Sequence, residues 1–233
     1  MKLKIAFAAI ILLLSFAAPV AAGPLDDGTA AYDRGDYATA LRLFRPLANQ
    51  GDPGAQYDLG IMYALGQGVA QNHAEAVKWY RNAADQGIAQ AQYNLGVAYS
   101  DGEGVPQNDA EAMRWYRLAA NQGDASAQVN LGVRYEFGPG VQQNYAEAVK
   151  WYRKAADQGV AKAQYNLGGM YAKGLGVPQD LVLAHMWFNL SAAQGKQDAA
   201  HNRDVAVQHM TPAQIAEAQK LAREWKPTKH TPE

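Results

Sequence analysis

An internal repeat of 36 residues constrains this chain more than any other feature of its sequence. The phrase KWYRNAADQG at residues 78–87 returns as RWYRLAANQG at 114–123 and as KWYRKAADQG at 150–159. Glycine, tyrosine and tryptophan each keep a column at this period: Gly60, Gly96, Gly132 and Gly168; Tyr63, Tyr99, Tyr135 and Tyr171; Trp79, Trp115, Trp151 and Trp187. A fixed period of this length is typical of a solenoid, whose small units bury their apolar faces against their neighbours.

Each unit has the pattern of a helix, a turn and a second helix. In residues 89–123, apolar positions recur every four residues up to Tyr99 and resume at steps of three to four after the segment DGEGVPQND. Gly102 and Gly104 can adopt the positive φ of a helix C-terminus, and Pro106 cannot continue the first helix. The unit is therefore predicted to be an αα-hairpin.

The second helix of each unit begins with a predicted capping box. Asn108 is the N-cap residue and Glu111 lies three residues later, where its side chain can return to the N-cap N–H. The same pair recurs as Asn72 with Glu75 and as Asn144 with Glu147. These boxes place the start of each second helix.

The glycine in the middle of each first helix needs a separate explanation. Gly96 should cost roughly 1 kcal/mol relative to alanine in an exposed helix. We expect the second helix to approach closely at this point, with its Trp and Tyr packed over the glycine. The glycine column is therefore interpreted as a packing feature and not as a ligand site.

These columns together resemble the Sel1-like repeat family, a relative of the tetratricopeptide repeats, through AQYNLGVAYSDGEGVPQNDAEAMRWYRLAANQG and its copies. The resemblance implies an all-α, right-handed solenoid of αα-hairpins with a C-terminal capping helix. We assign four repeats to residues 55–90, 91–126, 127–162 and 163–195. Residues 23–54 form a further N-terminal hairpin, whose shorter turn DRGDY looks more like a tetratricopeptide turn.

The last repeat carries an apolar stripe that needs a cover. Leu183, Met186 and Leu190 replace polar residues of the other repeats at helical spacing. The segment TPAQIAEAQKLAREW has the N-cap Thr211 and a capping box, so residues 196–226 are predicted to form capping helices, with a disordered tail at 227–233. This arrangement favours a monomer; the alternative is that the stripe docks a second copy.

The N-terminal 22 residues have the features of a cleaved signal peptide. Lys2 and Lys4 precede an apolar run over residues 5–16, and small residues lead to a cleavage site after Ala22. The alternative is a retained membrane anchor, but the run is shorter than the roughly 20 residues of a spanning helix. We therefore predict export without stable membrane insertion, to the periplasm, or to the medium from a cell without an outer membrane.

Composition argues against several classes of function. The chain has no cysteine and a formal charge of −1, with no basic run, so neither disulfides nor nucleic-acid binding is indicated. The five histidines show no i,i+4 pair, and the turn GEGVPQ lacks the preceding strand of a phosphate loop. We predict no metal, no cofactor and no catalytic residues.

The remaining candidate site is the concave face of the solenoid. In the tetratricopeptide pattern this face carries the residue before the LG pair and those one and five places after it. These positions form three columns here: Asp58, Asn94, Asn130 and Asn166; Ile61, Val97, Val133 and Gly169; Leu65, Asp101, Phe137 and Lys173. The candidate partner-binding residues are Asn94, Asn130, Asn166, Val97, Val133, Arg134, Asp101 and Phe137.

Two hypotheses follow for this face. An asparagine amide both donates and accepts hydrogen bonds, so a row of them can hold a peptide backbone, with Arg134 and Phe137 as anchors. Alternatively, the asparagines bond the adjacent repeat and hold the superhelix. The first hypothesis predicts an exported adaptor for a protein or peptide. The alternative function is an envelope enzyme or small-ligand binder, which a deep pocket with converging carboxylates or histidines would favour.

Overall fold

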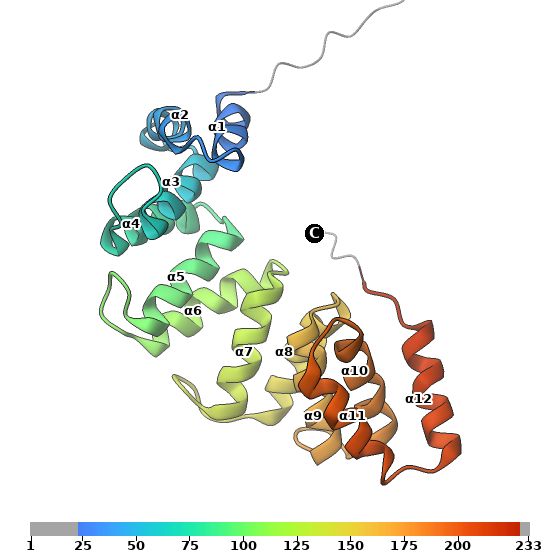
Figure 1. Ribbon diagram of the computed structural model, residues 1–233. Helices are drawn as coiled ribbons and strands as arrows, with labels where there is room; N and C mark the ends of the chain where they lie inside the picture. The colour runs from blue at the N-terminus through green and yellow to red at the C-terminus, as the bar shows by residue number, and fades with distance from the viewer. Residues whose placement is uncertain (1–22, 229–233) are drawn as a thin grey trace, which may run out of the picture.

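The computed structural model describes residues 23–228, which form twelve α-helices and no strand (Figure 1). The helices are α1 Pro24–Asp33, α2 Tyr37–Asn49, α3 Pro53–Leu65, α4 His73–Asp85, α5 Ala89–Asp101, α6 Asp109–Asn121, α7 Ala125–Phe137, α8 Tyr145–Asp157, α9 Ala161–Lys173, α10 Leu181–Ala193, α11 Gln197–Val207 and α12 Pro212–Glu224. Consecutive helices from α1 to α11 pack against each other along an open arc, and α12 packs on α10, so the predicted all-α solenoid is confirmed. The predicted signal peptide and residues 229–233 lie outside the described residues. No helix within residues 23–228 is long and apolar enough to cross a membrane.

The glycine column allows the close packing expected from the sequence. A Cβ atom at Gly96 would lie 2.7 Å from the ring of Tyr116, which leaves no room for a side chain. The same relation joins Gly60 to Tyr80, Gly132 to Tyr152 and Gly168 to Phe188. The aromatic ring over each glycine belongs to the second residue of the WY or WF pair. The tryptophan instead reaches the preceding repeat, where Trp115 is 1% exposed in a core with Val77 and Tyr80.

The turns also tie successive repeats together. Gly102 and Gly104 have φ values of 76° and 73°, as predicted. A Cβ atom at Gly104 would collide with the backbone of His73, which opens α4 in the preceding repeat. Each turn therefore rests on the start of the previous second helix.

The predicted capping boxes are half right. The Asn108 side chain accepts from the Glu111 N–H at 3.1 Å, and Asn72 and Asn144 cap their helices in the same way. The predicted reciprocal bond, from the N-cap N–H to the glutamate side chain, is absent. The Asn108 N–H donates instead to the Tyr99 carbonyl at 2.8 Å, so Glu111 is released to pair with Arg114 at 3.4 Å.

A glutamine ladder that the sequence analysis missed runs through the buried interior. Gln92 is 5% exposed; its Nε2 donates to the Ala84 carbonyl at 3.1 Å, and its Oε1 accepts from Gln122 Nε2 at 2.8 Å. Gln56, Gln128 and Gln164 make the same pair of bonds. Each glutamine thus joins three successive helices. The signal that could have revealed it is its recurrence two residues before the Asp or Asn of the first column.

The C-terminal helices cover the last repeat as predicted. Helix α12 packs on α10, where Leu183, Met186 and Leu190 share an apolar cluster with Leu221 and Trp225. Its capping box at Thr211 and Gln214 is present with both bonds. Thr228 N–H donates to the Asp157 carbonyl at 2.8 Å, so the chain is held for two residues past the predicted start of the tail.

Candidate functional site

The three predicted columns continue onto a further helix. Helix α11 begins at Gln197, 36 residues after the start of α9, so α11 occupies the place of another first helix. Asn202, Val205 and His209 follow Asn166, Gly169 and Lys173 at the same offset. We call the surface formed by these columns on α3, α5, α7, α9 and α11 the inner face. The predicted columns ended at Lys173 in the last repeat, although the 36-residue offset was the signal that would have extended them.

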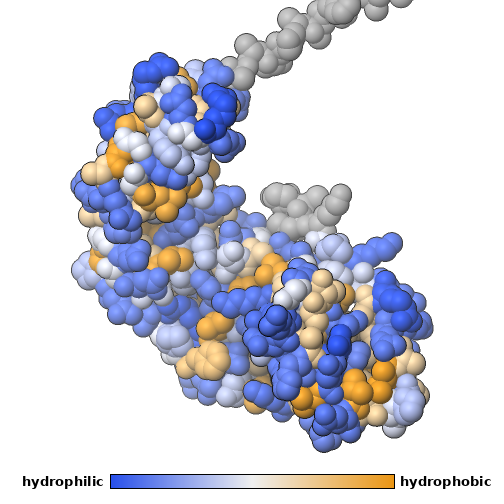
Figure 2. Space-filling model, viewed as in Figure 1, coloured by the Kyte–Doolittle hydropathy of each residue, from blue (hydrophilic) through white to orange (hydrophobic). Residues whose placement is uncertain are grey.

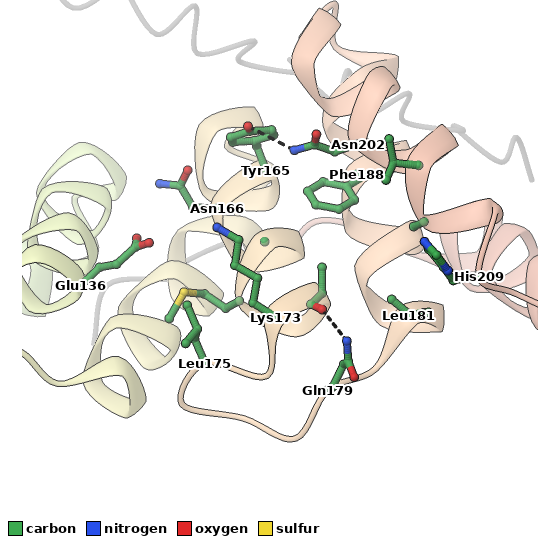
Figure 3. A pocket seen from close by; sticks show the side chains of 15 residues that line it. Glu136, Tyr165, Asn166, Lys173, Leu175, Gln179, Leu181, Phe188, Asn202 and His209 are labelled. Atoms are coloured by element: carbon green, nitrogen blue, oxygen red, sulfur yellow. Dashed lines mark hydrogen bonds between the residues drawn. The ribbon is translucent and has the colours of Figure 1, made fainter.

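Two cavities open along the inner face. The end pocket has a volume of about 660 Å³ and lies among α7, α9, α10 and α11 (Figure 3). Its lining includes Glu136, Asn166, Gly169, Lys173, Asn202 and His209 over an apolar floor of Met170 and Phe188. The N-terminal cavity has a volume of about 490 Å³ and is lined by α3, α4 and α5, including Ile61, Leu65, Asn94 and Val97.

The predicted site residues do not all meet in one place. Asn94 and Val97 line the N-terminal cavity, and Asn166 lines the end pocket. The other five, Asn130, Val133, Arg134, Asp101 and Phe137, line neither cavity. Val133 packs against the hydrophobic core, Asp101 is exposed, and Phe137 projects from the end of α7 with 69% of its surface exposed.

Arg134 is occupied inside the array. It is 7% exposed, and its guanidinium donates to Asp109 Oδ1 and Ser100 Oγ, each at 2.7 Å, and to the Pro139 carbonyl at 3.2 Å. Pro139 has no N–H to close the turn after α7, whereas Glu103 N–H closes the equivalent turn on the Ala98 carbonyl at 3.0 Å. Arg134 therefore holds an unusual turn and is not an exposed anchor.

Most asparagines of the first column contact tyrosines of the preceding repeat. Asn202 Nδ2 donates to the Tyr165 hydroxyl at 3.2 Å. Burial raises the pKa of Tyr93, while a hydrogen bond from Asn130 acts in the opposite direction; Asn94 has the same effect on the pKa of Tyr57. These contacts support the hypothesis that the asparagines help to hold the superhelix.

Asn166 has lost one of the two tyrosine partners that Asn94 and Asn130 have. The tyrosine that it would meet is replaced by Val129, which is 3% exposed. Its other aromatic neighbour, Tyr152, donates its hydroxyl to Glu136 Oε2 at 2.7 Å. Asn166 therefore keeps one tyrosine as a hydrogen-bond partner, Tyr152, and its amide faces the end pocket (Figure 3).

The acid and base groups of the end pocket are few. Glu136 comes from α7 and His209 from the turn after α11, on different walls. Over residues 23–228, no three His, Asp or Glu side chains group in a way that could hold a metal ion. The pocket thus combines an apolar floor with single polar groups, an arrangement suited to binding a small ligand or a side chain.

Comparisons with known proteins agree with this architecture. The Sel1 repeat family model matches residues 25–52, 53–88, 89–124, 125–160 and 161–196, so it includes the N-terminal hairpin. The crystal structure of a protective antigen of uropathogenic Escherichia coli with an SLR fold is similar, with 38% identity, a TM-score of 0.76 and a match covering 86% of this chain and 45% of the antigen. A Sel1 repeat protein from Oxalobacter formigenes has 34% identity and a TM-score of 0.71, covering 83% of this chain and 84% of that one. Curated protein sequences gave no significant match.

Proposed function

The chain belongs to the Sel1 repeat family, whose members generally act as protein-interaction scaffolds, and we propose that it is exported and binds a segment of a partner protein along its inner face. Sel1 repeat proteins are typically non-catalytic, and the proposal assigns no reaction to this chain.

The distribution of exposed apolar side chains carries this proposal. In the described part of the chain, four large hydrophobic residues are conspicuously exposed: Leu65 at 59%, Leu118 at 39%, Phe137 at 69% and Val205 at 42%. All except Leu118 lie in the inner-face columns. Apolar residues that gather on one face of a polar surface are typical of protein-binding sites, where a few large side chains supply most of the energy.

The spacing of these residues favours an extended segment as the partner. Leu65 and Phe137 lie two repeats apart in the third column, with the polar Asp101 between them. Apolar patches are likewise separated by hydrophilic surface along the arc (Figure 2). A partner segment with apolar side chains at intervals would fit this row better than one compact domain.

Export is part of the same proposal and rests on residues 1–22, whose charges and apolar run are those of a signal peptide. We propose the periplasm as the destination. Fractionation of cells that express the tagged protein tests this point: the tag should appear in the periplasmic fraction, and recovery in the cytoplasm alone would contradict it.

Photo-crosslinking in living cells tests the partner-binding face. A photoreactive amino acid replaces Leu65 or Phe137 on the inner face, and Leu118 on α6 is the matched control because it is also an exposed hydrophobic residue. We expect the same crosslinked partner from positions 65 and 137 and none from 118. Equal crosslinking from all three positions, or a partner captured only at 118, would contradict the proposal.

A further inference from the structure

Gly169 in the end pocket has no structural reason to be glycine. A Cβ atom there would meet nothing within 4 Å, whereas a Cβ atom at its neighbour Gly168 would lie 2.7 Å from Phe188. Gly169 lies inside α9 without a positive φ, so it lowers helix stability by roughly 1 kcal/mol without a packing benefit. Its column otherwise holds the branched residues Ile61, Val97, Val133 and Val205. The missing side chain leaves open space in the wall of the end pocket.

Two more departures from the repeat affect residues that line the same pocket. Val129 takes the place of a tyrosine and leaves the Asn166 amide with Tyr152 as its remaining tyrosine partner. Glu136 stands where the other repeats have the small residues Ala64, Ser100 and Ala172. Gly169 and Glu136 line the cavity, and Val129 removes one contact of a third lining residue, Asn166. Departures gathered around one cavity indicate a ligand site better than variation at unrelated surface positions would.

The charged groups of the pocket are complementary to a ligand with both charges. Glu136 reaches in from α7 and Lys173 from α9 (Figure 3). Neither forms an ion pair with another residue in the range 23–228, and the Tyr152 hydroxyl orients the Glu136 carboxylate through a bond of 2.7 Å. A ligand ammonium group could form an ion pair with Glu136, and a ligand carboxylate could form one with Lys173.

The floor of the pocket supplies the apolar part of the site. Met170 and Phe188 lie beneath the polar groups and are 1% and 2% exposed. The volume of about 660 Å³ lies within the usual range of roughly 300 to 1,000 Å³ for small-molecule sites and leaves room for more than one amino acid. We propose that the end pocket binds a zwitterion with apolar side chains, namely a short peptide with both termini free.

In this site the Asn166 amide contacts the peptide backbone, while the apolar side chains rest on Met170 and Phe188. Val205 lines the pocket, but Leu65 and Phe137, the two positions used for crosslinking, do not, so small-peptide binding is tested separately from the proposed partner binding. Failure of the crosslinking experiment would leave this inference intact.

Isothermal titration with three defined probes tests the charge requirement. Leucyl-leucine carries both charges, N-acetyl-leucyl-leucine lacks the ammonium group, and leucyl-leucinamide lacks the carboxylate. We expect leucyl-leucine to bind at least tenfold more tightly than either blocked form. No binding of leucyl-leucine at millimolar concentration, or equal binding of a blocked form, would overturn the proposal.

Variants then locate the site. Gly169→Val restores the residue type of the neighbouring repeats, so it should fold with unchanged or higher thermal stability and lose binding by at least tenfold. Lys173→Gln should remove the preference for a free carboxylate, and Glu136→Gln the preference for a free ammonium group. Lys162→Gln, at an exposed position of α9 outside the pocket, is the matched control and should bind normally. Normal binding by Gly169→Val, or a loss in Lys162→Gln equal to that in Lys173→Gln, would show that the peptide binds elsewhere.

Discussion

At the scale of single residues, Asp58 is the only charged member of a column that is otherwise asparagine. Burial, followed by the nearby carboxylates of Asp52 and Asp33, raises the pKa of Asp58 from 3.8 to about 6. At pH values between 3.8 and about 6, the Asp58 carboxyl group keeps its proton in the folded chain and has released it in the unfolded chain. The free energy of unfolding therefore falls as the pH rises through this range. At neutral pH the whole destabilisation caused by the charged Asp58 is present.

The Asp58→Asn variant should remove this cost. We expect it to raise the free energy of unfolding by roughly 1 kcal/mol at pH 7.5, after allowance for solvent screening at a half-buried site, and by much less at pH 4. Urea unfolding at the two pH values measures the difference. An equal gain at both would show that the stabilisation comes from the amide itself and not from the lost charge.

At the scale of elements, the ends of the helices could be predicted because each repeat has N-cap residues where a helix begins and glycines where one ends. Asn108 capped its helix as predicted, but the bond expected from Glu111 was absent because the Tyr99 carbonyl already holds the N-cap N–H. That carbonyl belongs to the preceding helix, so a local pattern could not reveal it.

The candidate site was predicted less completely than the helices. Asn166 was identified, but Glu136 has no counterpart in the other repeats, and Asn202 lies on a helix that lost the LG pair. Arg134, at the position next to the second column, was expected to be an exposed anchor and is buried, where it donates to Asp109 and Ser100. Columns show which residues share a face, whereas contacts across helices decide which of them are free.

Helix α12 offers a prediction at this scale. Truncation after Met210 would uncover Leu183, Leu190 and Trp187, whose ring packs edge-on against Trp225 at 6.2 Å. We expect the truncated protein to unfold at a lower temperature and to dimerise as its concentration rises, because the exposed stripe is apolar. Sedimentation velocity across a concentration series measures the association. A truncated chain with the sedimentation and stability of the intact protein would mean that α12 is not a cap.

At the scale of the whole molecule, contacts join mainly consecutive helices, so no single core spans the arc. Stability in such an array is the sum of the hairpins and of the interfaces between neighbours. The glutamine ladder, the tryptophans and the turns each connect one repeat to the next and supply this coupling. A mutation that destabilises one hairpin should therefore also destabilise its neighbours, and the effect should decrease with distance along the chain.

Gly132→Val tests this behaviour in the middle of the array. Its side chain would collide with the ring of Tyr152, while Gly169→Val adds the same atoms where nothing lies within 4 Å. By hydrogen exchange we expect Gly132→Val to lose protection in α7 and α8 and partly in α6 and α9, while α1 to α4 stay protected. Gly169→Val should exchange like the unaltered protein. Uniform loss of protection from α1 to α12 in Gly132→Val would instead mean that the solenoid unfolds as one cooperative unit, with interfaces stronger than the hairpins that they join.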